Sequence, residues 1–547
     1  MDIKTKSYQI FSSKAFHIGL LVIGAIFMLS GAFHDNIWFD ESYSVGIASH
    51  SFAEIWNYGS GDVHPVLYYY ALHIIHLLGG GLTAYRIFTV CGALALATLG
   101  FTHLRRDFGW ETGVLFTFFA LFTPYVSFLA IEVRMYSWAS CMVMLAFIYA
   151  FRISRNKSDS SDSPTQRATT HNWILFSLCS LAAAYLHYFS LMCAFIINLG
   201  LLIFLIFHRR ERKQDLRIFW IQAIVQVICY IPWLFALASQ LGVVSNTYWA
   251  KFQFPGTLIS LIRYPVITMQ IDFAWTGDYG IGPVIIVWAI VIAAIFLAIS
   301  IARGLYHYIK RQRTIVRKHY GSEPWYKRVG AFIARPENLP GFLGLGVYLG
   351  LFVMAALASM LMHSFMVYFR YMFCAIGPLF FALACLLHRI GNRSVSIAAC
   401  TLLFCLGLLN QALIVQDDYS PDNQAPIAYL EDNVTEGELV LSSDIGIEGV
   451  TACELPDIPQ DYLDWQPGNW KRAYMAYSPT LTSIPTWETV LNDYHGKFWV
   501  LGQSTNGSRP TDVDDLDAED DIEVVSSQVY YRPYERSYFT ITLMDKE

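Results

Sequence analysis

The sequence predicts an α-helical polytopic membrane protein of about 11 spans, followed by a small α/β domain. Of its 547 residues, 55% are hydrophobic and only 15% are charged, whereas soluble domains carry roughly 25% charged residues. Several runs of about 20 residues are nearly free of charge, which is the length that crosses a hydrocarbon core of about 30 Å. Backbone groups inside a bilayer must be paired within helices, so these runs are expected to be helical.

The distribution of positive charge orients these spans. Basic side chains gather at Arg105 and Arg106, in 208–213 and in 303–335, and all three clusters then lie on the cytoplasmic side. The N-terminus is therefore expected inside the cell and the C-terminus outside. The predicted spans are about residues 15–34, 83–102, 112–129, 137–153, 172–189, 191–207, 216–237, 283–302, 340–362, 371–388 and 394–414.

Two parts of the chain are expected outside the bilayer on the outer face. The first is the loop 35–82, whose apolar segment 64–78 is too short and too rich in histidine to span, and which we interpret as an interfacial helix. The second is residues 415–547, where ELVLSS and KFWVLG are typical of buried strands. Residues 1–414 thus form the predicted membrane domain, and 415–547 form the extracytoplasmic α/β domain. The ten cysteines show no zinc, redox or disulfide pattern.

Asp40 and Glu41 lie in WFDESYS, a few residues beyond the first predicted span. Adjacent carboxylates at this position could simply be solvated loop charges. The aromatic neighbours Trp38, Phe39 and Tyr43 favour a partly apolar pocket instead. Removing the proton of an attacking hydroxyl requires a base within hydrogen-bond reach. Asp40 is therefore the candidate catalytic base, and Glu41 is a candidate to position the acceptor or to hold a metal.

Two further groups lie at the predicted outer mouths of spans. His64 precedes Pro65 at the start of the interfacial helix, as an interface residue or as a group aimed at a phosphate. Glu132, Arg134 and Tyr136 follow in EVRMYS. Opposite charges at the mouth of a span are costly unless they are paired or functional. This second group can be interpreted as a structural ion pair or as a contact with sugar or phosphate.

His187, Arg370 and Tyr371 complete the candidate set. His187 ends a predicted span on the outside, where histidine and tyrosine are usually interface anchors. Arg370 lies where another span reaches the outer face, although arginine is disfavoured there. A snorkelling arginine is one interpretation, and a guanidinium that grips phosphate is the other. All the candidate groups fall on one side of the membrane, which favours a shared outward-facing site.

The order of these segments resembles that of the GT-C glycosyltransferases. The similarity is greatest to the protein O-mannosyltransferase-like branch, glycosyltransferase family 39, which also contains the lipid A aminoarabinose transferases. It covers roughly residues 15–415. The segments that carry it are WFDESYS, HPVLYYYAL, EVRMYSW, YLHYFSL and YFRYMFCAIGPL.

The resemblance implies a polyprenyl-phosphate sugar donor, an inverting reaction and an extracytoplasmic site. It implies that Asp40 is the base and that Glu41 is the second acidic position. His64 stands where relatives often carry histidine or lysine before Pro-Pro, here Pro-Val. Glu132, Arg134 and Tyr136 match the motif at the outer mouth. Arg370 and Tyr371 match a pair that resembles the family's contact with the donor phosphate.

We therefore expect a hexosyl- or pentosyltransferase in the plasma membrane, similar to the mannosyltransferases, that acts on a glycan, lipid or protein acceptor. No nucleic-acid partner and no definite cofactor are expected, and a divalent metal is left open because related enzymes differ. The alternatives are a transporter or flippase of lipid-linked saccharides and a non-catalytic scaffold. Clustering of the candidate residues at one face, without an internal inverted repeat, favours the enzyme.

Overall fold

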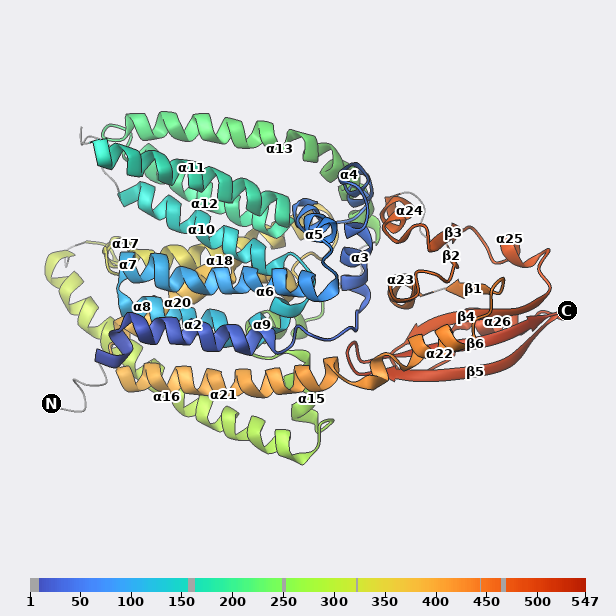
Figure 1. Cartoon of the computed structure of the whole chain (residues 1–547). Helices are drawn as coiled ribbons and strands as arrows, with labels where there is room; N and C mark the ends of the chain where they lie inside the picture. Colours follow the sequence, from blue (N-terminus) through green and yellow to red (C-terminus); the bar gives the residue numbers. More distant parts are fainter. Residues whose placement is uncertain (1–8, 156–162, 248–251, 321–322, 443, 464–468) are drawn as a thin grey trace.

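The computed structural model describes residues 9–155, 163–247, 252–320, 323–442, 444–463 and 469–547. Long helices lie side by side in a bundle, and a smaller domain with a β-sheet sits at one end of it (Figure 1). The predicted fold class, a polytopic helical protein with a small C-terminal α/β domain, is confirmed. The long helices are α2 (Lys14–Leu29), α6 (Leu82–Leu99), α8 (Trp110–Phe122), α10 (Tyr136–Arg155), α11 (Ser163–Leu186), α12 (Tyr188–Phe207), α13 (Lys213–Thr247), α16 (Ile281–Tyr320), α18 (Leu339–Leu361), α20 (Ile376–Ile390) and α21 (Arg393–Asp418).

The helices vary in how well they suit a bilayer. Within the described ranges, eight helices are long and apolar enough to cross a membrane. A ninth span results if α8 and α9 (Pro124–Ile131), which meet at a bend of 58°, are counted as one. Helix α2 is apolar but has only 16 residues. The predicted total of 11 spans therefore remains a prediction.

Short helices connect the long ones. The predicted outer loop 35–82 folds into α3, α4 and α5, and α4 begins with a capping box between Ser51 and Glu54. Helix α5 begins at Leu67, so the expectation that His64 and Pro65 open it is wrong, and His64 lies in the preceding turn. The short elements are α3 (Phe39–Ala48), α4 (Phe52–Gly59), α5 (Leu67–Leu77), η1 (Gly100–Leu104), α7 (Arg105–Phe108), α14 (Gly256–Arg263), α15 (Met269–Thr276), α17 (Trp325–Ile333), α19 (Phe369–Met372) and η2 (Phe373–Ala375).

The C-terminal domain is built on a six-stranded sheet of order β3-β2-β1-β4-β6-β5. Strands β3 (Leu481–Ile484), β2 (Gln460–Leu463), β1 (Leu439–Ser442) and β4 (Gly496–Ser504) are parallel. Strands β5 (Ile522–Arg532) and β6 (Ser537–Lys546) extend the sheet as an antiparallel hairpin. Apolar residues are buried on both of its faces. Its helices are η3 (Pro421–Asn423), α22 (Ala425–Asn433), α23 (Ile445–Glu454), α24 (Asn469–Tyr474), η4 (Met475–Tyr477), α25 (Glu488–Leu491) and α26 (Thr511–Leu516).

The tip of the β5–β6 hairpin reaches the helix bundle. Arg532, fully buried, donates through Nε to the carbonyl of Asn423 at 2.9 Å and through Nη2 to the carbonyl of Ile37 at 3.0 Å. Arg536 pairs with Asp417 at 3.1 Å, near the end of α21. These contacts tie the C-terminal domain to the segment that leads into α3. The sheet domain is thus bonded to the bundle beyond its covalent link at the end of α21.

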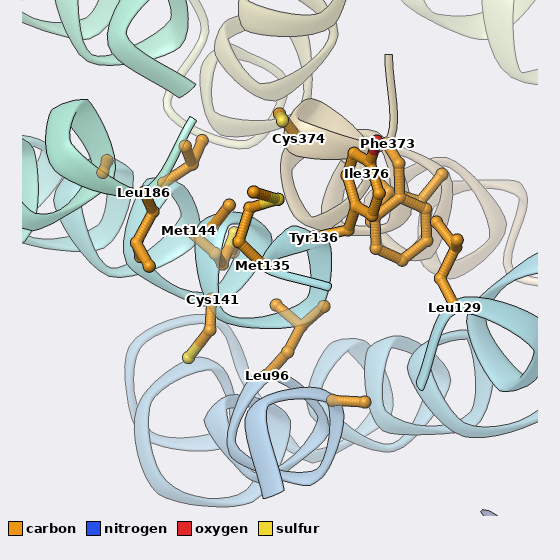
Figure 2. Close-up of a cluster of buried hydrophobic side chains, with 14 of the residues drawn as sticks. Leu96, Leu129, Met135, Tyr136, Cys141, Met144, Leu186, Phe373, Cys374 and Ile376 are labelled. Carbon is orange, nitrogen blue, oxygen red and sulfur yellow. The ribbon is translucent and has the colours of Figure 1, made fainter. Parts of the chain in front are cut away.

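A cluster of buried side chains fixes the segment 132–135 between α9 and α10, called the mouth below. Figure 2 shows Met135 and Tyr136 among side chains of α6, α9, α10, α11 and the η2–α20 segment. Met135 is fully buried and Tyr136 is 1% exposed. Because they follow Arg134 directly, their packing holds the backbone that presents the charged residues of this mouth. The labelled members of the cluster are Leu96, Leu129, Met135, Tyr136, Cys141, Met144, Leu186, Phe373, Cys374 and Ile376.

Close approach of α21 to α8 depends on a glycine. A Cβ atom placed on Gly407 would lie 2.4 Å from the carbonyl oxygen of Phe122, which is a backbone atom and cannot rotate away. Small residues are the usual means by which membrane helices approach closely. We expect Gly407→Ala to push the two helices apart and lower the free energy of unfolding by about 1–3 kcal/mol. Thermal unfolding of the purified protein in detergent measures this.

The matched control is Gly346→Ala in α18, where a new Cβ has no atom within 4 Å. This change should leave the protein unaffected or slightly more stable, because alanine is the better helix former. Equal melting temperatures for the Gly407 and Gly346 variants would contradict the packing argument.

Candidate active site

Asp40 lies in the first turn of α3, at the end of the bundle that faces the C-terminal domain. Its Oδ2 accepts a hydrogen bond from Nη1 of Arg370 at 2.6 Å. Arg134 lies on the other side, with Nη2 3.9 Å from Oδ1 and with Nη1 donating to the Asp40 carbonyl at 3.1 Å. The side chain of Asp40 is still 22% exposed. It is therefore held between two guanidinium groups without being sealed off.

Arg370 connects the carboxylate of Asp40 to that of Glu132. Its Nη2 donates to Oε1 of Glu132 while Nη1 serves Asp40. The rings of Trp38 and Tyr136 lie 5.1 Å and 5.3 Å from its guanidinium carbon, a favourable placement for a cation. The chain thus places Asp40, Glu132 and Arg370, which are far apart in sequence, within one hydrogen-bonded group.

The two carboxyl groups have different proton affinities. Burial raises the pKa of Asp40, but the charges of Arg134, Arg370 and His64 outweigh it, and the net pKa lies below the usual value. Burial dominates for Glu132 and raises its pKa to about 7, despite the opposing charge of Arg370. Asp40 is therefore ionised at neutral pH, while Glu132 can exchange a proton there.

Glu41 belongs to a second network, away from Asp40. Its side chain is fully buried and pairs with Nη2 of Arg86 at 3.0 Å. Its oxygens also accept from the backbone N–H of Val133 at 2.9 Å and from the hydroxyl of Tyr534 at 2.5 Å. These three partners come from α6, from the α9–α10 mouth and from the β5–β6 hairpin. This geometry favours a structural role for Glu41 over the predicted contact with acceptor or metal.

His64 and His187 are neighbours, and the charge of His64 acts on Asp40. Nδ1 of His64 lies 3.4 Å from Oδ2 of Asp62, and the hydroxyl of Tyr69 donates to the same oxygen at 3.1 Å. The His64 and His187 rings are 5.3 Å apart. His187 caps α12 by accepting from the backbone N–H of Phe189 at 3.1 Å through Nδ1. Its other ring nitrogen has no hydrogen-bond partner among the described residues.

Tyr136 and Tyr371 pack beside His187, with ring centres 5.4 Å and 5.3 Å from that of His187. Apart from Glu41, the sequence-predicted candidates are therefore connected to Asp40 by a continuous series of contacts through Arg370, Tyr136 and His187. Asp62 and Arg86 are not among the candidates predicted from the sequence. Asp62 is an acidic residue two positions before His64, and this spacing was an available signal. Arg86 is a charge within a predicted span, which is rarely tolerated without a partner.

A cavity of about 490 Å³ opens beside Arg370. Its wall is formed by residues of α14, α15 and the tip of the β5–β6 hairpin, together with Arg370 and Glu132. Aromatic side chains dominate its wall. Among the described residues, no three His, Cys, Asp or Glu side chains group as metal ligands. The lining residues are Trp38, Tyr125, Phe128, Ile131, Glu132, Ser260, Arg263, Tyr264, Ile267, Thr268, Met269, Asp272, Phe273, Tyr368, Phe369, Arg370, Asp418, Tyr534 and Glu535.

Comparison with known proteins gives two solved structures of ArnT from Cupriavidus metallidurans. This chain is similar to ArnT. The apo structure is 11% identical, covers 96% of this chain and 97% of its own length, and superposes with a TM-score of 0.48. The structure bound to undecaprenyl phosphate is 10% identical, with 97% and 98% covered and a TM-score of 0.45. ArnT is an aminoarabinose transferase, from the branch that the sequence resembles. No protein-family profile and no curated protein sequence matches the chain.

The buried Glu41–Arg86 pair yields a stability prediction. Glu41→Gln keeps the shape of the side chain but leaves the charge of Arg86 buried without its partner. Breaking a buried pair in this way costs about 3–5 kcal/mol. We expect a strongly lowered melting temperature for the purified protein.

Glu431→Gln is the matched control, since Glu431 is exposed on α22. It makes the same chemical change and should leave the melting temperature unaltered. A Glu41→Gln protein as stable as this control would show that the network does not hold the fold.

Proposed function

We propose that the chain is an inverting glycosyltransferase that moves a sugar from a polyprenyl-phosphate donor to an acceptor, with Asp40 as the catalytic base. The observation that carries this proposal is the Asp40–Arg370–Glu132 group beside the cavity. It offers an ionised carboxylate next to a guanidinium that can bind an anionic leaving group. The apolar helices suit a bilayer, in which a lipid-linked donor would be held.

Arg370 would bind the donor phosphate. A guanidinium forms strong, directional hydrogen bonds with phosphate oxygens. As the bond between sugar and phosphate breaks, negative charge grows on the leaving oxygen, and Arg370 would stabilise it, with Arg134 and His64 nearby. The phosphate is a good leaving group, so no strong general acid is required.

Asp40 would accept the proton of the attacking acceptor hydroxyl. In the ligand-free protein its two arginines keep the pKa low and therefore keep it a weak base. A donor phosphate that draws Arg370 toward itself would weaken the Arg370–Asp40 bond and raise the basicity of Asp40. Donor binding and activation of the base are then coupled through one side chain.

We place the site on the outer face of the plasma membrane, with the N-terminus in the cytoplasm. The basis is the distribution of arginine and lysine. The site end of the bundle carries α3 and the sheet domain, and the opposite end carries the basic α7 and α17 segments. Cytoplasmic loops are the ones enriched in lysine and arginine. A glycan, lipid or protein acceptor would approach from the extracytoplasmic side.

Replacing Asp40 tests the base. Asp40→Asn should abolish transfer from labelled polyprenyl-phosphate sugars while leaving donor affinity nearly intact, because Asn cannot accept the proton. Asp35→Asn changes an exposed residue of the same loop in the same way and should transfer normally. Near-normal turnover by folded Asp40→Asn protein would remove Asp40 from this role, and transport of an unmodified donor by the wild type would favour a flippase.

Replacing Arg370 tests the phosphate contact. Arg370→Ala should weaken donor binding by about tenfold or more, since charged hydrogen bonds of about 1.5–3 kcal/mol are lost. Binding of the donor to protein in nanodiscs measures this directly. Arg106→Ala, at the opposite end of the bundle and 65% exposed, is the control. An unchanged donor affinity in the Arg370 variant would contradict the assignment.

Glu132 predicts a pH dependence of donor affinity. Its pKa is raised to about 7, so its charge is lost as the pH falls through about 7. The neutral form competes less for Arg370 and repels the donor phosphate less. Affinity for the phosphodiester donor should therefore rise from about pH 8 to about pH 6, by up to tenfold per unit. Glu132→Gln should bind the donor tightly at every pH, and a pH profile identical to that of the wild type would exclude Glu132 as its source.

A further inference from the structure

A second cavity lies at the end of the bundle opposite to the candidate active site, and the proposed reaction does not use it. Its volume is about 650 Å³, in the range of small-molecule sites. The η1–α7 segment, the C-terminal part of α10 and the α11 residues 171 and 172 form its wall. In Figure 1 these helix ends lie away from α3 and the sheet domain. The lining residues are His103, Arg106, Asp107, Tyr149, Phe151, Arg152, Arg155, His171 and Asn172.

Positive charge dominates this wall. Three arginines and one aspartate line the cavity, so the formal charge of the lining residues is +2 before either histidine is counted. Two helices end here, α10 and the continuous helix 82–108. Each helix C-terminus contributes a partial charge of about −0.5, which leaves about +1 uncompensated. The lining residues and the two helix ends together therefore favour an anion.

A different arginine serves the last carbonyl groups of α10. Nη2 of Arg212 donates to the carbonyl oxygens of Ile153 at 3.1 Å and Ser154 at 2.5 Å. Its Nη1 pairs with Asp215 at 2.8 Å, so this pair adds no net charge. Arg212 does not line the cavity. The arginines of the cavity are therefore not required to bond these two carbonyl groups.

Asp107 occupies only part of the arginine wall. Its Oδ2 accepts from Nε of Arg152 at 2.6 Å, and its Oδ1 accepts from Nε of Arg106 at 3.0 Å. A guanidinium has five N–H donors, so Asp107 engages one donor of each. Arg155 is exposed and forms no ion pair with any described residue, and its guanidinium carbon lies 5.7 Å from the centre of the Phe151 ring. Arginine donors therefore remain for a ligand.

Arg152 and Arg155 are the two arginines best placed to share one ligand. They are three residues apart in α10 and therefore neighbours on one face of the helix. Arg106 is 65% exposed and is not needed for this contact. Guanidinium groups form charge-assisted, often bidentate, hydrogen bonds with phosphate oxygens. The amide of Asn172 adds a neutral donor to the same wall.

The depth of the cavity matches that of lipid headgroups. Two of the candidate membrane spans, 82–108 and 136–155, end at residues that line it or directly beside them. The polar headgroup region begins where the hydrocarbon core and the apolar part of a span end. A phosphate group at this level has two sources, the headgroup of an anionic phospholipid and a free phosphate ester.

We propose that the cavity between the η1–α7 segment, α10 and α11 binds a phosphate group through the guanidinium groups of Arg152 and Arg155. The site is separate from Arg370, which lies at the other end of the bundle. Binding here consequently does not depend on the proposed glycosyl transfer.

Two measurements on the purified full chain test the site and distinguish the sources of phosphate. Titration calorimetry with glycerol 3-phosphate in neutral detergent detects a free phosphate ester. Native mass spectrometry counts the phosphatidylglycerol retained from micelles that contain equal amounts of phosphatidylcholine. We expect saturable binding of glycerol 3-phosphate, preferential retention of phosphatidylglycerol, or both. Retention without binding of the free ester would identify a lipid headgroup as the ligand.

Substitutions in the wall should change this binding in opposite directions. Arg155→Gln should weaken it by at least about tenfold, because charged hydrogen bonds are lost. Arg155→Lys, which keeps the charge, should retain part of it. Asp107→Asn should bind more tightly, because its carboxylate no longer competes with phosphate for Arg152.

Arg210→Gln is the matched control, because Arg210 is exposed in the turn after α12 and does not line the cavity. It should bind as the wild type does. A wild type that neither binds glycerol 3-phosphate nor prefers phosphatidylglycerol would overturn the site, as would equal binding by the Arg155→Gln and Arg210→Gln variants. Arg370→Ala should retain the binding that Arg155→Gln loses. Its loss in Arg370→Ala would move the ligand to the candidate active site and overturn the inference.

Discussion

The buried carboxylate of Glu41 is the contact on which the arrangement of the site depends. It bonds to Arg86 in α6, to the backbone of Val133 and to Tyr534 in the hairpin. Val133 lies between Glu132 and Arg134, so Glu41 fixes the mouth that presents both. Arg86 in turn donates to the carbonyls of His34 and Asn36, which lead into α3. A single desolvated charge pair thus holds the segment that leads into α3, which carries Asp40, against the mouth that carries Glu132 and Arg134.

Adjacent residues on α3 have opposite roles for a geometric reason. Successive side chains of a helix point about 100° apart, so Asp40 and Glu41 lie in different environments. Glu41 points into the contact between the two domains and is sealed there, while Asp40 turns toward Arg370 and Arg134 and keeps some exposure. The two carboxylates are adjacent in the sequence and chemically alike. In the fold, one is a structural anchor and the other is available for chemistry.

The membrane fold, and the location of most candidate residues on one face of it, could be predicted from the sequence because the bilayer imposes simple rules. The length of each apolar segment predicts a helix, and the basic clusters predict on which side of the membrane each loop lies. Asp40, Glu132 and Arg370 could therefore be assigned to the same face of the membrane without coordinates. The partner of Glu41 was beyond such rules, since pairing with Arg86 depends on how α6 rotates against α3. The start of α5 at Leu67 was missed because Pro65 also fits a turn before a helix. Tyr534 lies 493 residues from Glu41, and nothing local links them.

The site is consequently a property of the assembled chain and not of the membrane domain alone. Trp38, Glu132 and Arg370 line the cavity, and the hairpin supplies Tyr534 and Glu535 to the same wall. The hairpin is held by Arg532 against the segment that leads into α3 and by Arg536 against the end of α21. Tyr534 lines the cavity and also donates a hydrogen bond to Glu41. The sheet domain therefore helps to hold the α3 segment that carries Asp40. The hydrogen bond from Tyr534 enters the buried Glu41–Arg86 ion pair of the bundle. The α/β domain is therefore part of the structure that supports the site, and more than a cover over the bundle.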